Sequence, residues 1–269
     1  KMDKENINFD KLLEDLTSQF GDKIVPFAYP NATGECFNGF ANLIDEVAYE
    51  YDGKNRKEVP LNDAQKAKID EYREMFMERI ALSEEALMEK YFEGEEFTKE
   101  EITRGIRGSV SNGTLVPLVV GCAEKAIGAD FLLDLIQRYI PSPADVGSVK
   151  GTKDGEEVVR KVDVNEPFSA IVFKTIVDPF VGKLTLFKVV SGKLTRDTEV
   201  YNSTKEKAEK LGGLYILRGK NQVDVSEIMA GDIGATSKLA FTQTGDTLCD
   251  KNNQTLYETI KYPQPTLFM

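Results

Sequence analysis

The chain has 269 residues, of which 41% are apolar and 29% charged, so we expect one large globular domain or two of ordinary size. It has no apolar run long enough to span a membrane and no apolar core of a signal peptide, so we expect no membrane span. Its net charge of −11 disfavours nonspecific binding of nucleic acid and gives no reason to expect a DNA partner. The lack of histidine excludes His-dependent triads and imidazole metal sites, and three scattered cysteines, Cys36, Cys122 and Cys249, indicate a reduced, cytoplasmic protein without a disulfide framework or thiol metal site.

Apolar residues at helical spacing predict a first helix from Phe9 to Phe20, and Gly21 stands where such a helix would stop. A short strand, Ile24–Phe27, is expected after it. The region 37–51 alternates only weakly between apolar and polar residues, so it predicts a mixture of strand and turn.

A long helix is predicted after Asn62 or Asp63, because either side chain can cap its first turn. Its buried stripe follows spacings of three and four: Ile69, Tyr72, Phe76 and Ile80. A second helical run is expected over 83–91. Thr98 and Glu101 form a capping box that predicts a third helix, with its apolar side packed inward.

The dense apolar run Leu115–Val120 is typical of a buried parallel strand, and the small residues Gly121-Cys122-Ala123 end it. A further helix is predicted over Asp130–Ile140. Pro141-Ser142-Pro143 then stops that helix, because proline cannot continue one, and we place the domain boundary there.

The second half of the chain is rich in β-branched and aromatic residues. Asp154-Gly155 predicts a hairpin turn. Three β-rich runs follow, separated by Pro and Gly: Phe168–Ile176, Lys183–Val190 and Glu199–Tyr201. Both faces of these runs carry apolar residues, which favours a closed or sandwiched sheet, and the residue pattern by itself indicates a generic β-barrel.

The exact residues of the stretch 166–200 are more informative than its pattern of apolar and polar positions. Its centre is Asp-Pro-Phe-Val-Gly-Lys-Leu-Thr-Leu-Phe-Lys-Val. Together with Ala230–Ala235 and Thr244–Cys249 it closely resembles the second domain of elongation factor G, a translational GTPase of the ribosome. The resemblance implies α/β plus all-β architecture: the C-terminal part of a P-loop GTPase domain with an α+β insert, then a translation-factor-type β-barrel.

The resemblance also implies the limits of the domains. Residues 1–143 are expected to be the end of the G domain, with an inserted subdomain at about 28–113. Residues 144–262 are expected to form the barrel (domain II), and 263–269 a linker to domains that the chain lacks. The chain begins at Lys1 and not at methionine, which favours a piece of a longer protein.

GTPases of this family read guanine with an Asn-Lys-x-Asp motif, and Lys1-Met2-Asp3 matches its last three positions. The Asp carboxylate accepts two guanine hydrogens, which adenine cannot supply, and the Lys stem packs on the base. Three residues are too few to identify the motif by themselves, and the competing interpretation is that they form a frayed, exposed terminus. Their position relative to Gly121-Cys122-Ala123, the second element of a guanine site, supports the motif interpretation.

In the family, a small-residue loop after the next strand contacts the guanine carbonyl through a backbone N–H. Cys122 stands where serine is usual, which preserves a backbone contact but puts hydroxyl support of Asp3 in doubt. The resemblance thus implies a base pocket of Lys1, Asp3, Cys122, Ala123 and Glu124. The alternative for Cys122 is an ordinary small buried residue.

The phosphate-binding chemistry is missing from the sequence. A P-loop requires Gly-x-x-x-x-Gly-Lys-Ser/Thr, and no such spacing occurs; no Asp-x-x-Gly occurs either. We therefore assign no catalytic or metal-binding residue, and we expect the fragment to be unable to hydrolyse GTP. The resemblance implies that the parent binds GTP or GDP with Mg²⁺.

The resemblance implies ribosomal partners, both rRNA and ribosomal proteins, and translocation of tRNA and mRNA. The barrel would pack on the small ribosomal subunit. The insert would face the ribosomal stalk, and the acidic residues of the chain are concentrated in it, over 45–101. Alternatives are a tetracycline ribosome-protection or release-factor-type GTPase, which the long insert disfavours, and a non-catalytic acidic interaction module. The segment Leu214–Lys220 departs from the housekeeping pattern and favours a paralogue.

Overall fold

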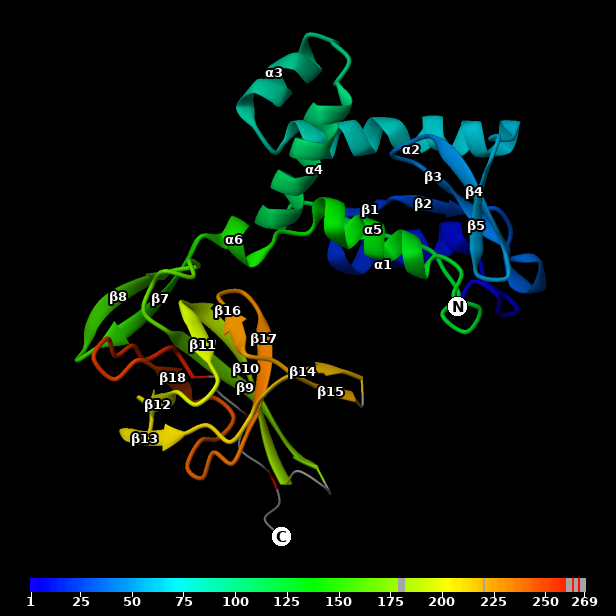
Figure 1. Ribbon diagram of the computed structural model, residues 1–269. Coiled ribbons are helices and arrows are strands. Elements are labelled where there is room, and N and C mark those ends of the chain that lie inside the picture. Colours follow the sequence, from blue (N-terminus) through cyan, green and yellow to red (C-terminus); the bar gives the residue numbers. More distant parts are fainter. Residues whose placement is uncertain (179–181, 220, 260–262, 264–265, 267–269) are drawn as a thin grey trace. The chain divides into compact units, whose positions relative to one another are not determined.

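The computed structural model describes residues 1–178, 182–219, 221–259, 263 and 266, and the chain forms two compact units, 1–141 and 142–269 (Figure 1). Most of the expected linker 263–269 and the turn at 179–181 lie outside the described residues. Among the described helices, none has the length and apolar character needed to cross a membrane.

Unit 1 combines helices with two small sheets. Its helices are α1 (Phe9–Phe20), α2 (Asp63–Ala81), α3 (Glu85–Phe92), α4 (Lys99–Asn112) and α5 (Ala129–Tyr139), with a 3₁₀ turn at Gly34–Cys36. Its strands are β1 (Ile24–Pro26), β2 (Ala28–Pro30), β3 (Gly39–Asn42), β4 (Val47–Asp52), β5 (Asn55–Val59) and β6 (Val116–Leu118). Strands β2-β3-β4-β5 form an antiparallel sheet, and β1 pairs with β6 in parallel.

Side-chain caps explain where the helices begin. The Asn8 side chain accepts a hydrogen bond from the Lys11 N–H at 3.0 Å and starts α1. Capping boxes start α2, at Asn62, and α4, at Thr98, which confirms both predicted starts. The predicted stripe of α2 is also confirmed, since all four of its residues are buried in the core of unit 1.

The prediction for Leu115–Val120 is wrong in part. Its two end residues are buried, but β6 is only three residues long and Val116 is 39% exposed. The reason is that β6 pairs only with β1 among the described strands, so its other edge and much of its surface face solvent.

Unit 2 is built almost entirely of strands. It opens with the one-turn helix α6 (Pro143–Val146), capped by Ser142. Its strands are β7 (Ser148–Lys153), β8 (Glu156–Lys161), β9 (Ser169–Asp178), β10 (Gly182–Ser191), β11 (Lys193–Thr195), β12 (Glu199–Asn202), β13 (Lys207–Lys210), β14 (Leu214–Arg218), β15 (Asn221–Asp224), β16 (Glu227–Met229), β17 (Ile233–Ser237) and β18 (Thr247–Cys249).

Eight of these strands form one strongly curved sheet in the order β13-β12-β18-β9-β10-β17-β14-β15, with β7-β8 and β11-β16 as two-stranded additions (Figure 1). Ala170 and Val172 of β9 point to the same core as Phe187 and Val189 of β10, and all four are fully buried. The closed or sandwiched sheet expected from the sequence is thus present, and the fold is barrel-like. The core of unit 2 is separate from that of unit 1.

Candidate functional site

The structure brings the start of the chain to the loop that follows β6. The Met2 N–H donates to the Gly121 carbonyl oxygen at 3.2 Å, and the Lys1 α-amine lies 2.9 Å from the same oxygen. Met2 is only 5% exposed and belongs to the core of unit 1, whereas Lys1 is exposed. The two segments that sequence reasoning paired, 1–3 and 121–124, therefore lie side by side although they are 120 residues apart.

Asp3 is the most enclosed charged group of this cluster. Only 6% of its side chain is exposed, and the ammonium nitrogen Nζ of Lys4 lies 3.6 Å from its carboxylate. The Cys122 thiol donates a hydrogen bond to this carboxylate, which lowers the pKa of Asp3 against the opposing effect of burial. Asp3 is thus ionised at neutral pH, with carboxylate oxygens that act only as acceptors.

The loop after β6 is a closed turn with a narrow neck. Cys122 and Ile127 exchange two backbone hydrogen bonds, N–H to O at 2.9 and 3.0 Å. An added Cβ at Gly121 would lie 2.7 Å from the Ile127 oxygen, so only glycine fits at this close approach.

These bonds decide which backbone donors are free. The Cys122 N–H is already bound to Ile127, so it cannot contact a base carbonyl. The N–H groups of Ala123 and Glu124 have no hydrogen-bond acceptor within the described part of the chain. The N–H groups of Ala123 and Glu124 are therefore among the donors of this loop that remain available to a ligand.

Sequence reasoning did not identify Lys4 as a member of the cluster. Its Nζ lies 3.3 Å from the Glu124 carboxylate and 3.6 Å from that of Asp3, so it bridges the two segments. Glu124 itself is largely exposed and lies at the rim. The only sequence signal for Lys4 was its place beside Asp3, because a partner in the distant loop cannot be read from local spacing.

Chemically, the cluster offers a fixed carboxylate, unused backbone donors that include the N–H groups of Ala123 and Glu124, and the exposed side chain of Lys1. This is a set of groups for hydrogen-bonding a flat polar ring. Within the described residues, no group of three Cys, Asp or Glu side chains has metal-binding geometry.

Comparisons with known proteins bear on the class of protein. The family described as elongation factor G domain 2 matches residues 167–251, which hold β9 to β18. A crystal structure of a protein from Thermus thermophilus is similar over 99% of this chain, with a TM-score of 0.82 and 27% sequence identity. The chain spans only 38% of the length of that protein.

The fold and the family match define a chain with the second domain of a translation elongation factor. The resemblance to elongation factor G is confirmed: residues 167–251 match the elongation factor G domain 2 family, and the chain as a whole is similar in fold to the Thermus thermophilus protein.

Proposed function

We propose that this chain is part of a translational GTPase that promotes translocation of tRNA and mRNA on the ribosome. The observation that carries the proposal is the domain 2 match over residues 167–251. We further propose that 1–143 is the C-terminal part of the G domain with its insert at 28–113, that 144–262 is the barrel, and that the parent supplies the P-loop and the Mg²⁺ ligands.

The contact between residues 1–4 and the 121–124 loop supports a guanine site. An ionised Asp3 can accept the two donors of guanine, whereas adenine offers no such pair, so the carboxylate discriminates between the bases. The N–H of Ala123 or Glu124 is available for the guanine carbonyl, and the Lys1 stem for the face of the ring.

Exposed apolar surface on unit 1 supports the G-domain assignment. Leu132, Leu133 and Ile136 of α5, and Ile140 directly after it, are between 41% and 66% exposed. The parallel sheet beside it has only two described strands, and parallel sheets are normally larger and covered on both faces. Further strands and helices of a complete GTPase domain would cover such surfaces.

The guanine assignment is tested by titrating the 269-residue chain with GDP and ADP while recording ¹H–¹⁵N spectra. We expect weak binding of GDP that shifts the resonances of Met2–Lys4 and Ala123–Lys125, no effect of ADP, and loss of the GDP shifts in Asp3→Ala. Asp15→Asn, an exposed carboxylate of α1, is the control. Equal shifts with both nucleotides would refute base discrimination by Asp3.

The ribosomal assignment is tested separately, by pelleting the chain with 70S ribosomes at low and moderate salt. We expect the chain to sediment with ribosomes through the barrel and, at the stalk, through the acidic insert. A chain that stays in the supernatant under all conditions would favour an acidic interaction module whose partner is not the ribosome.

A further inference from the structure

The sequence between residues 84 and 101 is the most acidic part of the chain, with eight glutamates and two lysines. Two of the glutamates are neutralised within the fold. Glu101 binds Lys90 at 2.9 Å and Glu84 binds Arg104 at 3.1 Å. Glu93, Glu95 and Glu96 are exposed and have no ion-pair partner among the described residues, so a concentrated negative charge remains on this surface.

A hollow with apolar walls lies at the base of this charge. Its walls are Met77 of α2, Tyr91 of α3 and Phe97, and its volume is about 230 Å³. Glu95 and Glu96 line the same hollow. We call it the α2–α3 groove. Phe92, the last residue of α3, is 79% exposed and adds apolar surface beside Tyr91.

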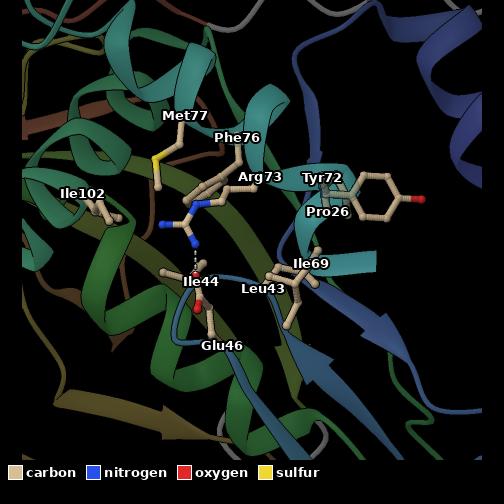
Figure 2. Close-up of a pocket in the computed structure, with 10 residues that line it drawn as sticks. All are labelled: Pro26, Leu43, Ile44, Glu46, Ile69, Tyr72, Arg73, Phe76, Met77 and Ile102. Atoms are coloured by element: carbon tan, nitrogen blue, oxygen red, sulfur yellow. Dashed lines mark hydrogen bonds and ion pairs between the residues drawn. The ribbon is translucent and has the colours of Figure 1, made fainter. Parts of the chain in front are cut away.

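Arg73 and Met77 also line a second, smaller pocket, of about 40 Å³, between α2 and the segment before β4. Figure 2 shows the Arg73 guanidinium facing the Glu46 carboxylate, with Ile44 and Ile102 nearby. Arg73 is thus already paired, and its charge does not neutralise Glu95 and Glu96.

The groove is held in shape before any partner arrives. Helix α3 ends in a closed turn in which the Gly94 N–H donates to Tyr91 and the Glu95 N–H to Lys90, both at 3.1 Å. The Lys90–Glu101 pair and the Thr98 capping box then fix the following helix. A preformed groove loses less conformational entropy on binding than a flexible one.

We propose that the α2–α3 groove is a docking site for a basic protein segment that inserts one large apolar side chain between Met77, Tyr91 and Phe97. Lysine or arginine residues on either side of that anchor would pair with Glu95, Glu96 and Glu93. This inference uses only residues of unit 1 and stands independently of the guanine proposal, but it concerns the same acidic insert that the proposed function places at the ribosomal stalk.

The negative charge around the groove and the volume of the groove both favour a basic protein segment as its ligand. An acidic rim repels phosphate groups, which makes nucleic acid an unsuitable ligand. The volume suits one side chain and is smaller than the roughly 300–1,000 Å³ of typical small-molecule sites. An apolar anchor in a pocket with complementary charges around it is a common form of protein recognition.

The probe is a blocked pentapeptide with phenylalanine at the centre and two lysines on each side, titrated into the full chain in ¹H–¹⁵N experiments. We expect shift changes at Met77, Tyr91 and Phe97. Replacing the central phenylalanine by alanine should weaken binding about tenfold or more, because its apolar burial is lost. Equal affinity of the two peptides would overturn the anchor.

Matched variants test the rim. Glu95→Gln with Glu96→Gln should weaken the phenylalanine peptide about fivefold at low salt, and added salt should reduce the difference. Glu14→Gln with Asp15→Asn removes the same charge from exposed positions on α1 and should leave the affinity unchanged. An equal loss in both double variants, or shifts that map outside the groove, would show attraction to net charge only and refute the site.

Discussion

Cys122 is the residue whose expected role differs most from the role that the structure gives it. Sequence reasoning left its support of Asp3 in doubt because a thiol replaces the usual hydroxyl. In the structure the side chain is buried and its thiol donates to the Asp3 carboxylate. The backbone contact expected of Cys122 is instead committed to Ile127, which spacing along the chain could not reveal.

This arrangement predicts the pKa of Asp3 in two variants. Cys122→Ala removes the donor, so the pKa of Asp3 should rise toward its ordinary value. Cys122→Ser should keep the pKa low. Carboxyl-carbon NMR titration of Asp3 measures both. If alanine and serine give the same pKa, the thiol does not act on Asp3.

At the scale of elements, helix starts were predictable because capping is local: the same four residues that contain Thr98 and Glu101 contain the whole interaction. The exposure of β6 was not predictable, because it depends on whether another strand lies at its free edge. Local patterns report what a residue prefers, whereas burial depends on distant partners.

The start of α4 carries a pH dependence. The Thr98 N–H and then Lys90 lower the pKa of Glu101 to about 2, from 4.5 in an unfolded chain. The folded pKa is depressed, so the stabilisation is complete above about pH 4.5 and is lost as the pH falls toward 2. Hydrogen exchange of the first turn of α4 should accelerate over this window. In Glu101→Gln the amide oxygen can still accept from the Thr98 N–H but carries no titrating charge, so the exchange should show no such added dependence.

A buried polar network joins β12 to the segment before β18. Asn202 donates at 2.9 Å to both Asp246 and Thr242, and Thr242 donates to Glu209. All four side chains are at most 6% exposed, so each depends on its partners. Polar residues in a β-rich stretch gave no sign of this network in the sequence.

Asn202→Ala should therefore destabilise unit 2 by about 2 kcal/mol, since it leaves a buried carboxylate with one donor fewer. Denaturant unfolding followed through the resonances of unit 2 measures the loss. Asn252→Ala, at an exposed position, is the matched control and should change stability by less than about 0.5 kcal/mol. Similar losses in the two variants would contradict the importance of the network.

At the scale of the whole molecule, the division into two units follows from two cores that share no residue. The second unit was predictable as a barrel because residues 166–200 are rich in β-branched and aromatic residues and resemble a known barrel domain. The first unit was harder to predict because its parallel pairing joins β1 to β6 across most of the unit's length.

Separate cores predict separate folding. Residues 142–259 expressed without unit 1 should give a dispersed ¹H–¹⁵N spectrum and a cooperative unfolding transition, because their buried cluster lies entirely within them. Residues 1–141, with the exposed apolar face of α5, should be less soluble. A collapsed spectrum for 142–259 would show that its fold depends on unit 1.

The bond between Met2 and Gly121 joins residues that are far apart in the chain. The entropy of closing a loop rises only slowly with length, by about 0.6 kcal/mol for each doubling, so the stability of this contact tolerates long additions between its ends. The rate of closure is more sensitive, because distant contacts form after local ones. During synthesis, residues 1–4 therefore emerge long before the loop they bind, and the contact between residues 1–4 and the 121–124 loop can form only after the intervening residues have left the ribosome.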